Sequence, residues 1–414
     1  MHSHLVYLSL KSLELHTKKL SLIVADDRVA SMQPKRSPKL SIAAAISIIS
    51  VFGISIGLTV PVLALVLSET GYSSAAIGAH VSVQFLGLML ASSITPALLV
   101  RFGVSNLMIF GILSIAFVLS CFALVGGFLP WLILRFFLGA AEAIIFVSAD
   151  TWINQIAPQN KRGQIIGLYA AAISAGFGMG PFLLVFTGVN GPAPFLIGAI
   201  IALITLPLLI ATHGHPPRVY PASQHSQWGL ATKLPIPIIF TMLFGILFAA
   251  AFGLLPVYGV SLNLTPDAAA RLAGVFILGG VICQFPIGVI ADRMNRYRLL
   301  YFSAILAPLA LLTSTLVWDI KPLLFGLIFL SGGLIGSFWT IPLMLFGDNF
   351  EGSDLASINS VSAILYAFGS TVGPSIVGIC MLWSPHALMF TMALATLAVA
   401  IPGLLYQFLS RNRP

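Results

Sequence analysis

The chain contains twelve apolar segments of about the length, roughly 20 residues, that an α-helix needs to cross the hydrocarbon core of a bilayer. Backbone polar groups must be satisfied within the segment in lipid, so each segment is predicted to be a helix. Only 8% of the residues are charged and 58% are hydrophobic, against about 25% charged in soluble proteins. The sequence therefore predicts an all-α polytopic membrane protein. The predicted spans are 41–67, 75–95, 105–126, 130–153, 163–187, 193–212, 235–260, 266–287, 298–318, 322–346, 355–380 and 386–408.

The distribution of basic residues predicts the orientation. If the N-terminus lies in the cytoplasm, 17 of the 20 Lys and Arg residues fall in cytoplasmic segments, and only Lys321 lies in an opposite loop. The positive-inside rule then places both termini in the cytoplasm. The net charge of +8 is scattered over short loops without a basic stripe, which argues against a nucleic-acid partner.

Two halves are predicted from an internal repeat. Gly176, Gly180 and Pro181 match Gly369, Gly373 and Pro374 at an offset of 193 residues, and Pro130 matches Pro322 at 192. A parallel duplication of a six-helix unit explains this repeat and puts a binding site between the halves. The expected divisions are a cytoplasmic tail over 1–39, bundles over 40–212 and 235–408, a linker over 213–234 and a short tail over 409–414.

The N-terminal tail has no long apolar run and no small-residue cleavage site, so we expect no signal peptide. Met32 also precedes a sequence typical of a membrane-protein start. Whether residues 1–31 are translated therefore stays open at this point.

Arg135 and Glu142 are the most informative residues in the spans. Together with Gly139 they fall at steps of four and three in one apolar segment, so helical geometry puts them on one side. Ionisable groups inside a membrane are rare, turn towards a bundle interior and mark transport paths. A proton-exchanging carboxyl beside a guanidinium is the functional interpretation, and a fixed ion pair that braces the helix is the structural one.

Loop and helix motifs resemble those of major facilitator superfamily transporters from about residue 40 onward. The signature Gly-x-x-x-Asp-Arg-x-Gly-Arg-Arg/Lys matches residues 288–298 well, with Gly288, Asp292, Arg293 and Arg296. Its first-half copy is degraded to Arg101 and Gly103, whereas Arg135 and Gly139 meet the segment-four signature Arg-x-x-x-Gly. Residues 150–154 and 346–355 are similar to the bacterial YcaD-like branch.

This resemblance implies a monomeric secondary transporter in the bacterial inner membrane, which carries a small organic molecule with a proton as the coupling ion. It also implies a cytoplasmic gate in which Asp292, Arg293 and Arg296 face Asp348, Glu351 and Asp354. Oppositely charged loops would latch when the site opens outward and separate when it opens inward. A solvated charge cluster is the alternative.

Asp150 lies near the inner end of its span, next to Trp152. It would either receive the proton from Glu142, cap a helix end or pair with a loop arginine, and the interfacial Trp152 favours the loop pairing. The glycine and proline pairs at 176–181 and 369–374 predict close helix packing and a bend where the halves rock.

Polar and aromatic residues inside the spans are candidate substrate contacts, and Trp339 and Tyr366 are suited to stacking on a ring-shaped substrate such as a drug or a flavin-like vitamin. We expect no cofactor or metal, because the three cysteines and eight histidines show no ligand spacing. A proton-independent facilitator or channel, and a membrane-embedded enzyme, remain as alternatives. The candidates are His80, Gln84, Gln284, Trp339, Asn359 and Tyr366.

Overall fold

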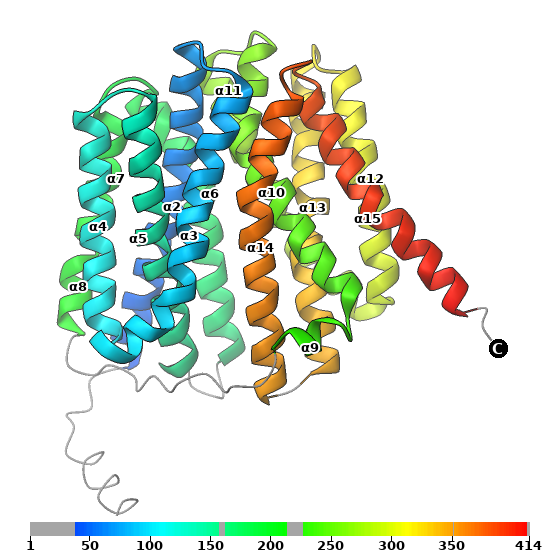
Figure 1. Cartoon of the computed structure of the whole chain (residues 1–414), viewed down its shortest axis with the longest axis horizontal. Coiled ribbons are helices and arrows are strands. Elements are labelled where there is room, and N and C mark those ends of the chain that lie inside the picture. Colours follow the sequence, from blue (N-terminus) through cyan, green and yellow to red (C-terminus); the bar gives the residue numbers. More distant parts are fainter. Residues whose placement is uncertain (1–37, 157–161, 213–226, 351, 412–414) are drawn as a thin grey trace, which may run out of the picture. The chain divides into compact units, whose positions relative to one another are not determined.

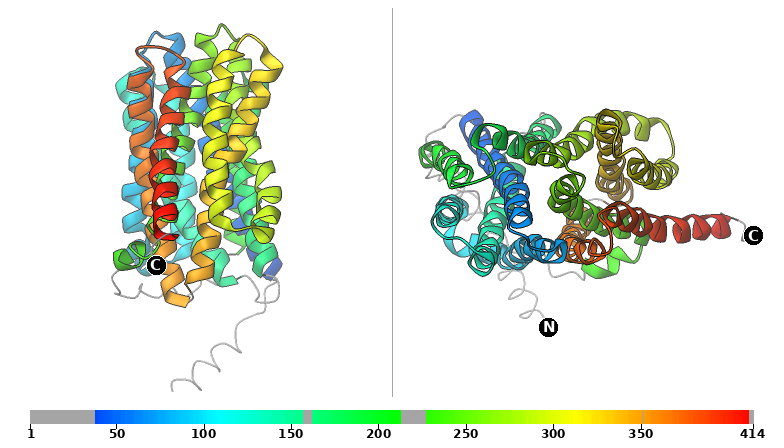
Figure 2. Two further views of the ribbon diagram at one scale, coloured as in Figure 1. Left: turned by 90° about the vertical axis from the view of Figure 1, so that its right-hand side faces the viewer. Right: turned by 90° about the horizontal axis from the view of Figure 1, so that it is seen from above.

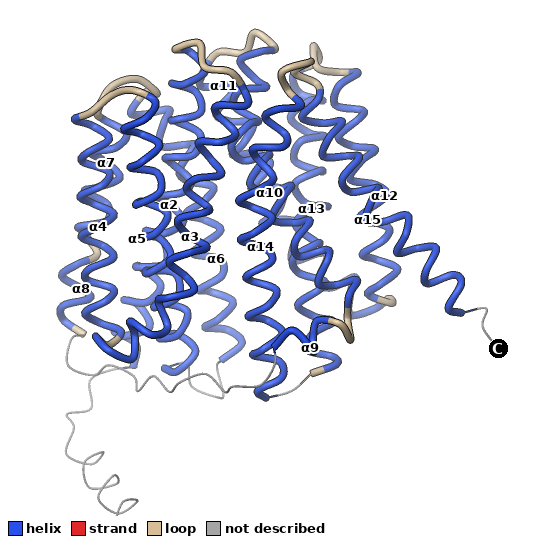
Figure 3. The backbone as a smooth tube through the Cα atoms, in the orientation of Figure 1, coloured by secondary structure: helices blue, strands red, loops and turns tan. Residues whose placement is uncertain are grey.

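The computed structural model describes residues 38–156, 162–212, 227–350 and 352–411. These residues form helices joined by short connections, and the described part of the chain holds no strand (Figure 3). Residues 1–37 of the predicted N-terminal tail, Glu351 and most of the predicted linker lie outside the described residues, whereas residues 38 and 39 of the predicted tail already belong to the first described helix.

Two series of helices follow one another along the chain (Figure 1). The first series is α2 (Pro38–Glu69), α3 (Ser74–Phe102), α4 (Val104–Leu124), α5 (Phe128–Ile156), α6 (Arg162–Thr187), α7 (Ala193–Ile204) and α8 (Leu206–Ala211). The second is α9 (Gln227–Ala231), α10 (Pro235–Ser261), α11 (Pro266–Arg293), α12 (Arg296–Leu316), α13 (Lys321–Asn349), α14 (Gly352–Cys380) and α15 (Ala387–Arg411).

Most of these helices have the length of a membrane span. Among the described residues, 11 segments are long and apolar enough to cross a bilayer, and α6 holds a further, shorter apolar stretch, Leu168–Leu184. The predicted all-α polytopic fold is thereby confirmed. The sixth span is divided at Thr205 into α7 and α8, where Pro207 at the start of α8 removes a backbone donor and begins a new helix.

Close helix crossings repeat in the two halves. A Cβ atom at Gly139 in α5 would overlap the carbonyl oxygen of Gln84 in α3, and a Cβ at Gly332 in α13 would overlap the carbonyl oxygen of Phe276 in α11. The offsets are 193 residues for the glycines and 192 for their partners. The same backbone geometry therefore recurs, as expected for two pseudo-symmetric six-helix bundles, and the bundles lie side by side when seen from above (Figure 2).

A second pair of crossings supports the same correspondence. Gly53 in α2 lies against the carbonyl oxygen of Ile173 in α6, and Gly245 in α10 lies against that of Tyr366 in α14. These positions are again 192 and 193 residues apart. Positions in α2 and α3 thus correspond to positions 192 residues later. Positions at the crossings of α5 and α6 correspond to positions 193 residues later, whereas Pro130 at the start of α5 keeps the offset of 192.

The halves contact each other near the ends of α3 and α14 that carry Ser74 and Gly378, which we call the serine end. The Ser74 hydroxyl donates to the carbonyl of Gly378 at 2.9 Å, and the Ser375 hydroxyl lies 2.8 Å from that of Ser82. Gly78 packs so closely on Pro374 that a side chain there would overlap its carbonyl. The opposite end, which carries Arg101 and Arg296, is called the arginine end.

We expect Gly139→Ala to destabilise the fold, because the added methyl group would meet the backbone of Gln84 rather than a movable side chain. Forcing extra atoms into a packed interior typically costs about 1–3 kcal/mol. Thermal unfolding in detergent should therefore show a lowered midpoint. Gly126→Ala is the matched control, since a Cβ at Gly126 meets nothing within 4 Å; equal midpoints for the two variants would contradict the close crossing.

Candidate coupling and binding site

Helix α5 carries Arg135 and Glu142 into the interior of the first half. Both side chains have an exposed fraction of 0%, as predicted from their shared helix face. Burying a charge in a membrane costs about 2.5–3.5 kcal/mol on insertion scales, so compensating hydrogen bonds are required. Neighbouring helices provide them.

Gln84 in α3 lies between the two charged groups. Its amide nitrogen donates to both oxygens of Glu142 at 3.1 and 2.9 Å, and its amide oxygen accepts from Arg135 at 2.7 Å. Arg135 and Glu142 form no direct ion pair within the described residues. The two groups are therefore linked through Gln84, and whether they brace the helix stays a prediction.

Helix α2 completes the network. The Ser55 hydroxyl donates to Glu142 at 2.7 Å, and Arg135 donates at 3.4 Å to the carbonyl of Thr59, with the carbonyl of Val60 at 3.5 Å. Three helices of one half are thus joined through a single carboxyl and a single guanidinium. We call Ser55, Gln84, Arg135 and Glu142 the polar network.

His80 lies one helical turn from Gln84 and is also fully buried. Its Nε2 lies 3.3 Å from the carbonyl oxygen of Phe128, whereas its Nδ1 has no hydrogen-bond partner among the described residues. The Nε of Arg135 is likewise without a partner there. Two buried nitrogen atoms in or near the network therefore lack a hydrogen-bond partner among the described residues.

The second half has apolar residues at every position equivalent to these polar ones. Gln84 corresponds to Phe276, Arg135 to Ile328 and Glu142 to Ile335, and all three are buried. The remaining polar residues of this region, Ser55, Thr59 and His80, correspond to Leu247, Ala251 and Leu272. Because the second half makes the same close crossings with apolar side chains, crossings of this kind do not depend on a polar network.

Aromatic rings form a continuous run from one half to the other. Phe52 in α2 contacts Phe146 and Phe177 at centroid distances of 5.1 and 5.8 Å. Phe177 in α6 in turn contacts Phe248 and Phe252 of α10, in the second half, at 5.7 and 6.2 Å. These ring contacts join the two bundles.

The run ends in the second half at three rings. Phe244 stacks on Tyr366 with centroids 5.7 Å apart, and Trp339 lies 5.8 Å from Phe244 and 5.4 Å from Tyr366. All three residues are half-buried. We call Phe244, Trp339 and Tyr366 the aromatic cluster.

The remaining predicted contact residues lie outside these two groups. Within the described residues, no hydrogen bond or ring contact joins Gln284, which is half-buried on α11, or Asn359, which is exposed on α14, to the polar network or the aromatic cluster. Asp150 is exposed near the end of α5. Its predicted role in proton release stays a prediction.

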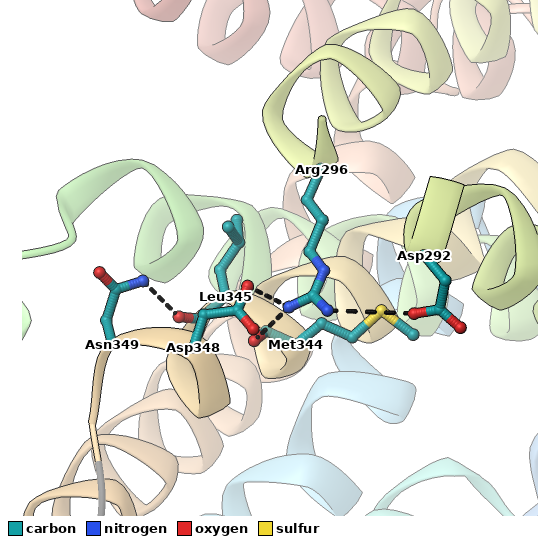
Figure 4. Close-up of polar contacts among 6 residues, drawn as sticks. All are labelled: Asp292, Arg296, Met344, Leu345, Asp348 and Asn349. Atoms are coloured by element: carbon teal, nitrogen blue, oxygen red, sulfur yellow. Dashed lines mark hydrogen bonds and ion pairs between the residues drawn. The ribbon is translucent and has the colours of Figure 1, made fainter. Parts of the chain in front are cut away.

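The predicted cytoplasmic gate residues meet only in part (Figure 4). Arg296 forms an ion pair with Asp348 and lies 4.0 Å from Asp292, and it also donates to the carbonyl of Met344 at 2.9 Å. Arg293 and Asp354 are exposed. These contacts fasten α11 and α12 to α13 inside the second half, so a latch between the halves stays a prediction.

Gly288 fits the same interface, since a Cβ there would lie 3.7 Å from the Met344 side chain in α13. The other glycines predicted to pack closely also lie against neighbouring helices. Gly176 and Gly180 pack on Gly53 and Gly57, Gly369 and Gly373 pack on Met242 and Ile246, and Pro181 and Pro374 lie near Gly274 and Gly78 of the opposite half.

Sequence reasoning did not identify Ser55 and Thr59, although their i, i+4 spacing puts both hydroxyl groups on one face of the helix. It also missed Phe52 and Phe244. Their equivalence under the 192-residue offset marks both as repeated positions in α2 and α10.

The fold and this buried site define a membrane carrier with two matched halves. The sequence profile of the Major Facilitator Superfamily matches residues 44–271 and 238–414. The chain belongs to this superfamily and is a multi-pass membrane transporter rather than an enzyme.

Curated relatives agree with this assignment. The chain is 25% identical to the uncharacterized MFS-type transporter YfkF of Bacillus subtilis (strain 168), over 79% of this chain and 85% of the relative. It is also 25% identical to an uncharacterized MFS-type transporter of Yersinia pestis (strain Pestoides F), over 82% of this chain and 89% of the relative.

Solved structures show the same fold. A crystal structure of a D-xylose-proton symporter superposes with a TM-score of 0.73 at 14% identity, covering 88% of this chain and 97% of the other. The nucleoside transporter NupG superposes with a TM-score of 0.70 at 14% identity, covering 87% of this chain and 98% of the other.

Proposed function

We propose that this protein is a proton-coupled carrier of small planar aromatic molecules, with Glu142 as the proton-exchanging group. The observation that carries this proposal is the polar network, which is fully buried in one half and replaced by apolar residues in the other. The equivalent crossings of the second half form without such a group, and a charge buried in a membrane costs a few kcal/mol. A role in transport accounts for that cost.

The aromatic cluster supports the substrate class. Trp339, Tyr366 and Phe244 are half-buried aromatic residues in mutual contact, and aromatic pairs contribute about 0.5–1.5 kcal/mol beyond the area that they bury. No charged side chain belongs to the cluster. A flat, largely uncharged heterocycle fits this surface better than a sugar, which would need several hydrogen-bonding partners.

The contacts between the halves support an inward-facing state. Hydrogen bonds and close packing join the halves at the serine end, and the predicted orientation puts that end on the outer side of a bacterial inner membrane, with both chain termini in the cytoplasm. The substrate path would then open at the arginine end. Rocking of the two halves would open the site alternately to the two sides of the membrane.

Among the related folds, the D-xylose-proton symporter is by its name a proton-coupled carrier. The fold is therefore compatible with coupling. We further propose that this chain acts as a monomer, because one chain supplies both halves of the site.

A thermal-shift screen of the purified protein in detergent tests the substrate class. We expect planar heteroaromatic compounds to raise the unfolding midpoint and sugars to leave it unchanged, because a ligand that binds only the folded state stabilises it, by about 2.7 kcal/mol at one hundred times its Kd. Trp339→Ala should abolish the shift. Trp318→Ala, which changes an exposed tryptophan outside the cluster, should retain it.

A shift produced by sugars and not by heterocycles would contradict the proposed substrate class. A shift by heterocycles that survives Trp339→Ala would move the binding site away from the aromatic cluster. Equal, gradient-independent flux of the bound compound in both directions would instead indicate a facilitator or a channel.

A further inference from the structure

We propose that Gln84 is the positioning residue that transmits the charge state of Glu142 to Arg135 and to helix α2. This inference rests on the proton coupling proposed above and goes beyond it. It assigns the step between proton binding and helix movement to one neutral side chain.

The orientation of the Gln84 amide depends on the charges on both sides of it. Its nitrogen faces the carboxylate oxygens of Glu142, and its oxygen faces a guanidinium nitrogen of Arg135. The reverse orientation would point the amide oxygen at a carboxylate and the amide nitrogen at a guanidinium, which has only donors. With both neighbours ionised, only the orientation seen in the structure satisfies all three groups.

Protonation of Glu142 weakens this agreement. One proton is taken up by one carboxylate oxygen, no covalent bond is broken, and the new O–H group can donate to the Ser55 hydroxyl oxygen. The protonated oxygen no longer accepts well from Gln84, and the bond to the other oxygen loses its charge assistance. Gln84 then remains bound to Arg135 but is held less firmly by Glu142.

Protonation of Glu142 would change the hydrogen bonds that the network makes with helix α2. Ser55 donates to Glu142 and the carbonyls of Thr59 and Val60 face Arg135, so both ends of the network hold one stretch of α2. Pro61 follows at once, and a proline within a helix removes a backbone donor and weakens the ladder there. A change in the hydrogen bonds of Gln84 would thus act on the part of α2 that bends most easily.

The same stretch of α2 reaches the other half. Phe52 lies one helical turn from Ser55 and contacts Phe177, which packs on α10. Two side chains of the neighbouring helices face Glu142, namely Ser55 of α2 and Gln84 of α3. The charged or titratable groups nearby are Arg135 on the same helix and His80 one turn from Gln84.

The second half indicates that a variant without the amide will fold. Phe276 takes the place of Gln84 at the equivalent crossing and is buried next to Gly332. Gln84→Met keeps the length of the side chain and removes the hydrogen bonds. Leu88→Met, one turn further along α3 and also buried, is a volume-conserving control that leaves the amide in place.

Two measurements on the detergent-purified full chain test the proposal without a substrate. Spin labels at Gly126→Cys and Trp383→Cys, in a background with Cys121, Cys283 and Cys380 replaced by Ala, report the distance between the halves at the serine end over a pH series. The infrared C=O band of the protonated carboxyl, assigned by its loss in Glu142→Gln, reports protonation of Glu142.

We expect the parent and Leu88→Met to show a distance distribution that changes with the same pH midpoint as the Glu142 band. In Gln84→Met the band should still titrate, while the pH-dependent change in distance is lost. A Gln84→Met protein whose distances follow pH as in the parent would overturn the role of Gln84 and leave proton coupling intact.

Loss of the pH response in Leu88→Met as well would assign the effect to packing on α3 and would also overturn the proposal. A parent without a Glu142 band and without a pH-dependent distance would overturn the proposed coupling itself, and this inference with it. The two failures are therefore distinguishable.

Discussion

The double variant Ser82→Cys, Ser375→Cys is expected to lose transport completely on oxidation and to regain it on reduction. The two hydroxyl oxygens lie 2.8 Å apart across the halves, which brings the two side chains close enough for the short Cβ separation of about 3.5–4.5 Å that a disulfide requires. A covalent link at the serine end would hold the halves together there and stop them from rocking. Transport of the compound selected by thermal shift, measured in proteoliposomes before and after addition of reductant, checks the effect.

The pair Ser93→Cys, Ser375→Cys is the matched control, because Ser93 is exposed further along α3 towards the arginine end. Both double variants need the background without Cys121, Cys283 and Cys380, which are all half-buried. Undiminished transport by a quantitatively crosslinked Ser82→Cys, Ser375→Cys protein would show that the serine end does not open during the cycle.

Glu142→Gln is expected to abolish accumulation driven by a pH gradient while it preserves exchange of internal for external compound. The substituted amide has nearly the shape of the carboxyl and can still contact Ser55 and Gln84, but it cannot take up or release a proton. Accumulation should fall to the point at which the concentrations on the two sides are equal, because the gradient no longer contributes free energy. Uptake into proteoliposomes with an imposed pH gradient, compared with counterflow in the same vesicles, separates the two activities.

Asp267→Asn makes the same chemical change at an exposed acid in the first turn of α11. It should accumulate the compound as the wild type does. Gradient-driven accumulation by Glu142→Gln at the wild-type level would remove Glu142 from the mechanism.

The fold was predictable from the sequence because the lipid surroundings restrict the backbone more than any single contact does. A bilayer admits only helices of a given length, so the twelve apolar segments alone determine the helical architecture. The burial of Arg135 and Glu142 followed from the same argument, since neither charge can face lipid. The repeat at Gly176 and Gly369 indicated the two halves.

The connections within the site were not predictable in this way. The spacing of residues along α5 relates Arg135 to Glu142, but it does not specify which side chains of α2 and α3 lie opposite. Gln84 was therefore predicted as a possible contact and not as the bridge between the two charges. The close crossing at Gly139 brings Gln84 into that place, and such a crossing depends on the packing of the whole half.

The aromatic cluster shows the same limit. Trp339 and Tyr366 were each recognised as suitable for stacking, whereas their contact with Phe244 joins α13 and α14 to α10, which is far from them in the sequence. The charged loops were also recognised, but the ion pairs of Arg296 remain inside the second half. Composition identifies groups that need partners, and only the tertiary structure specifies the partners.

The account depends most on the proposal that a proton moves at Glu142 during the transport cycle. Addition of the selected heteroaromatic compound to lightly buffered proteoliposomes that contain the wild-type protein and a pH-sensitive dye tests this claim directly. We predict a change in internal pH that begins with the addition of compound and is absent from vesicles with Glu142→Gln. Movement of the compound without any accompanying change in pH would contradict the account.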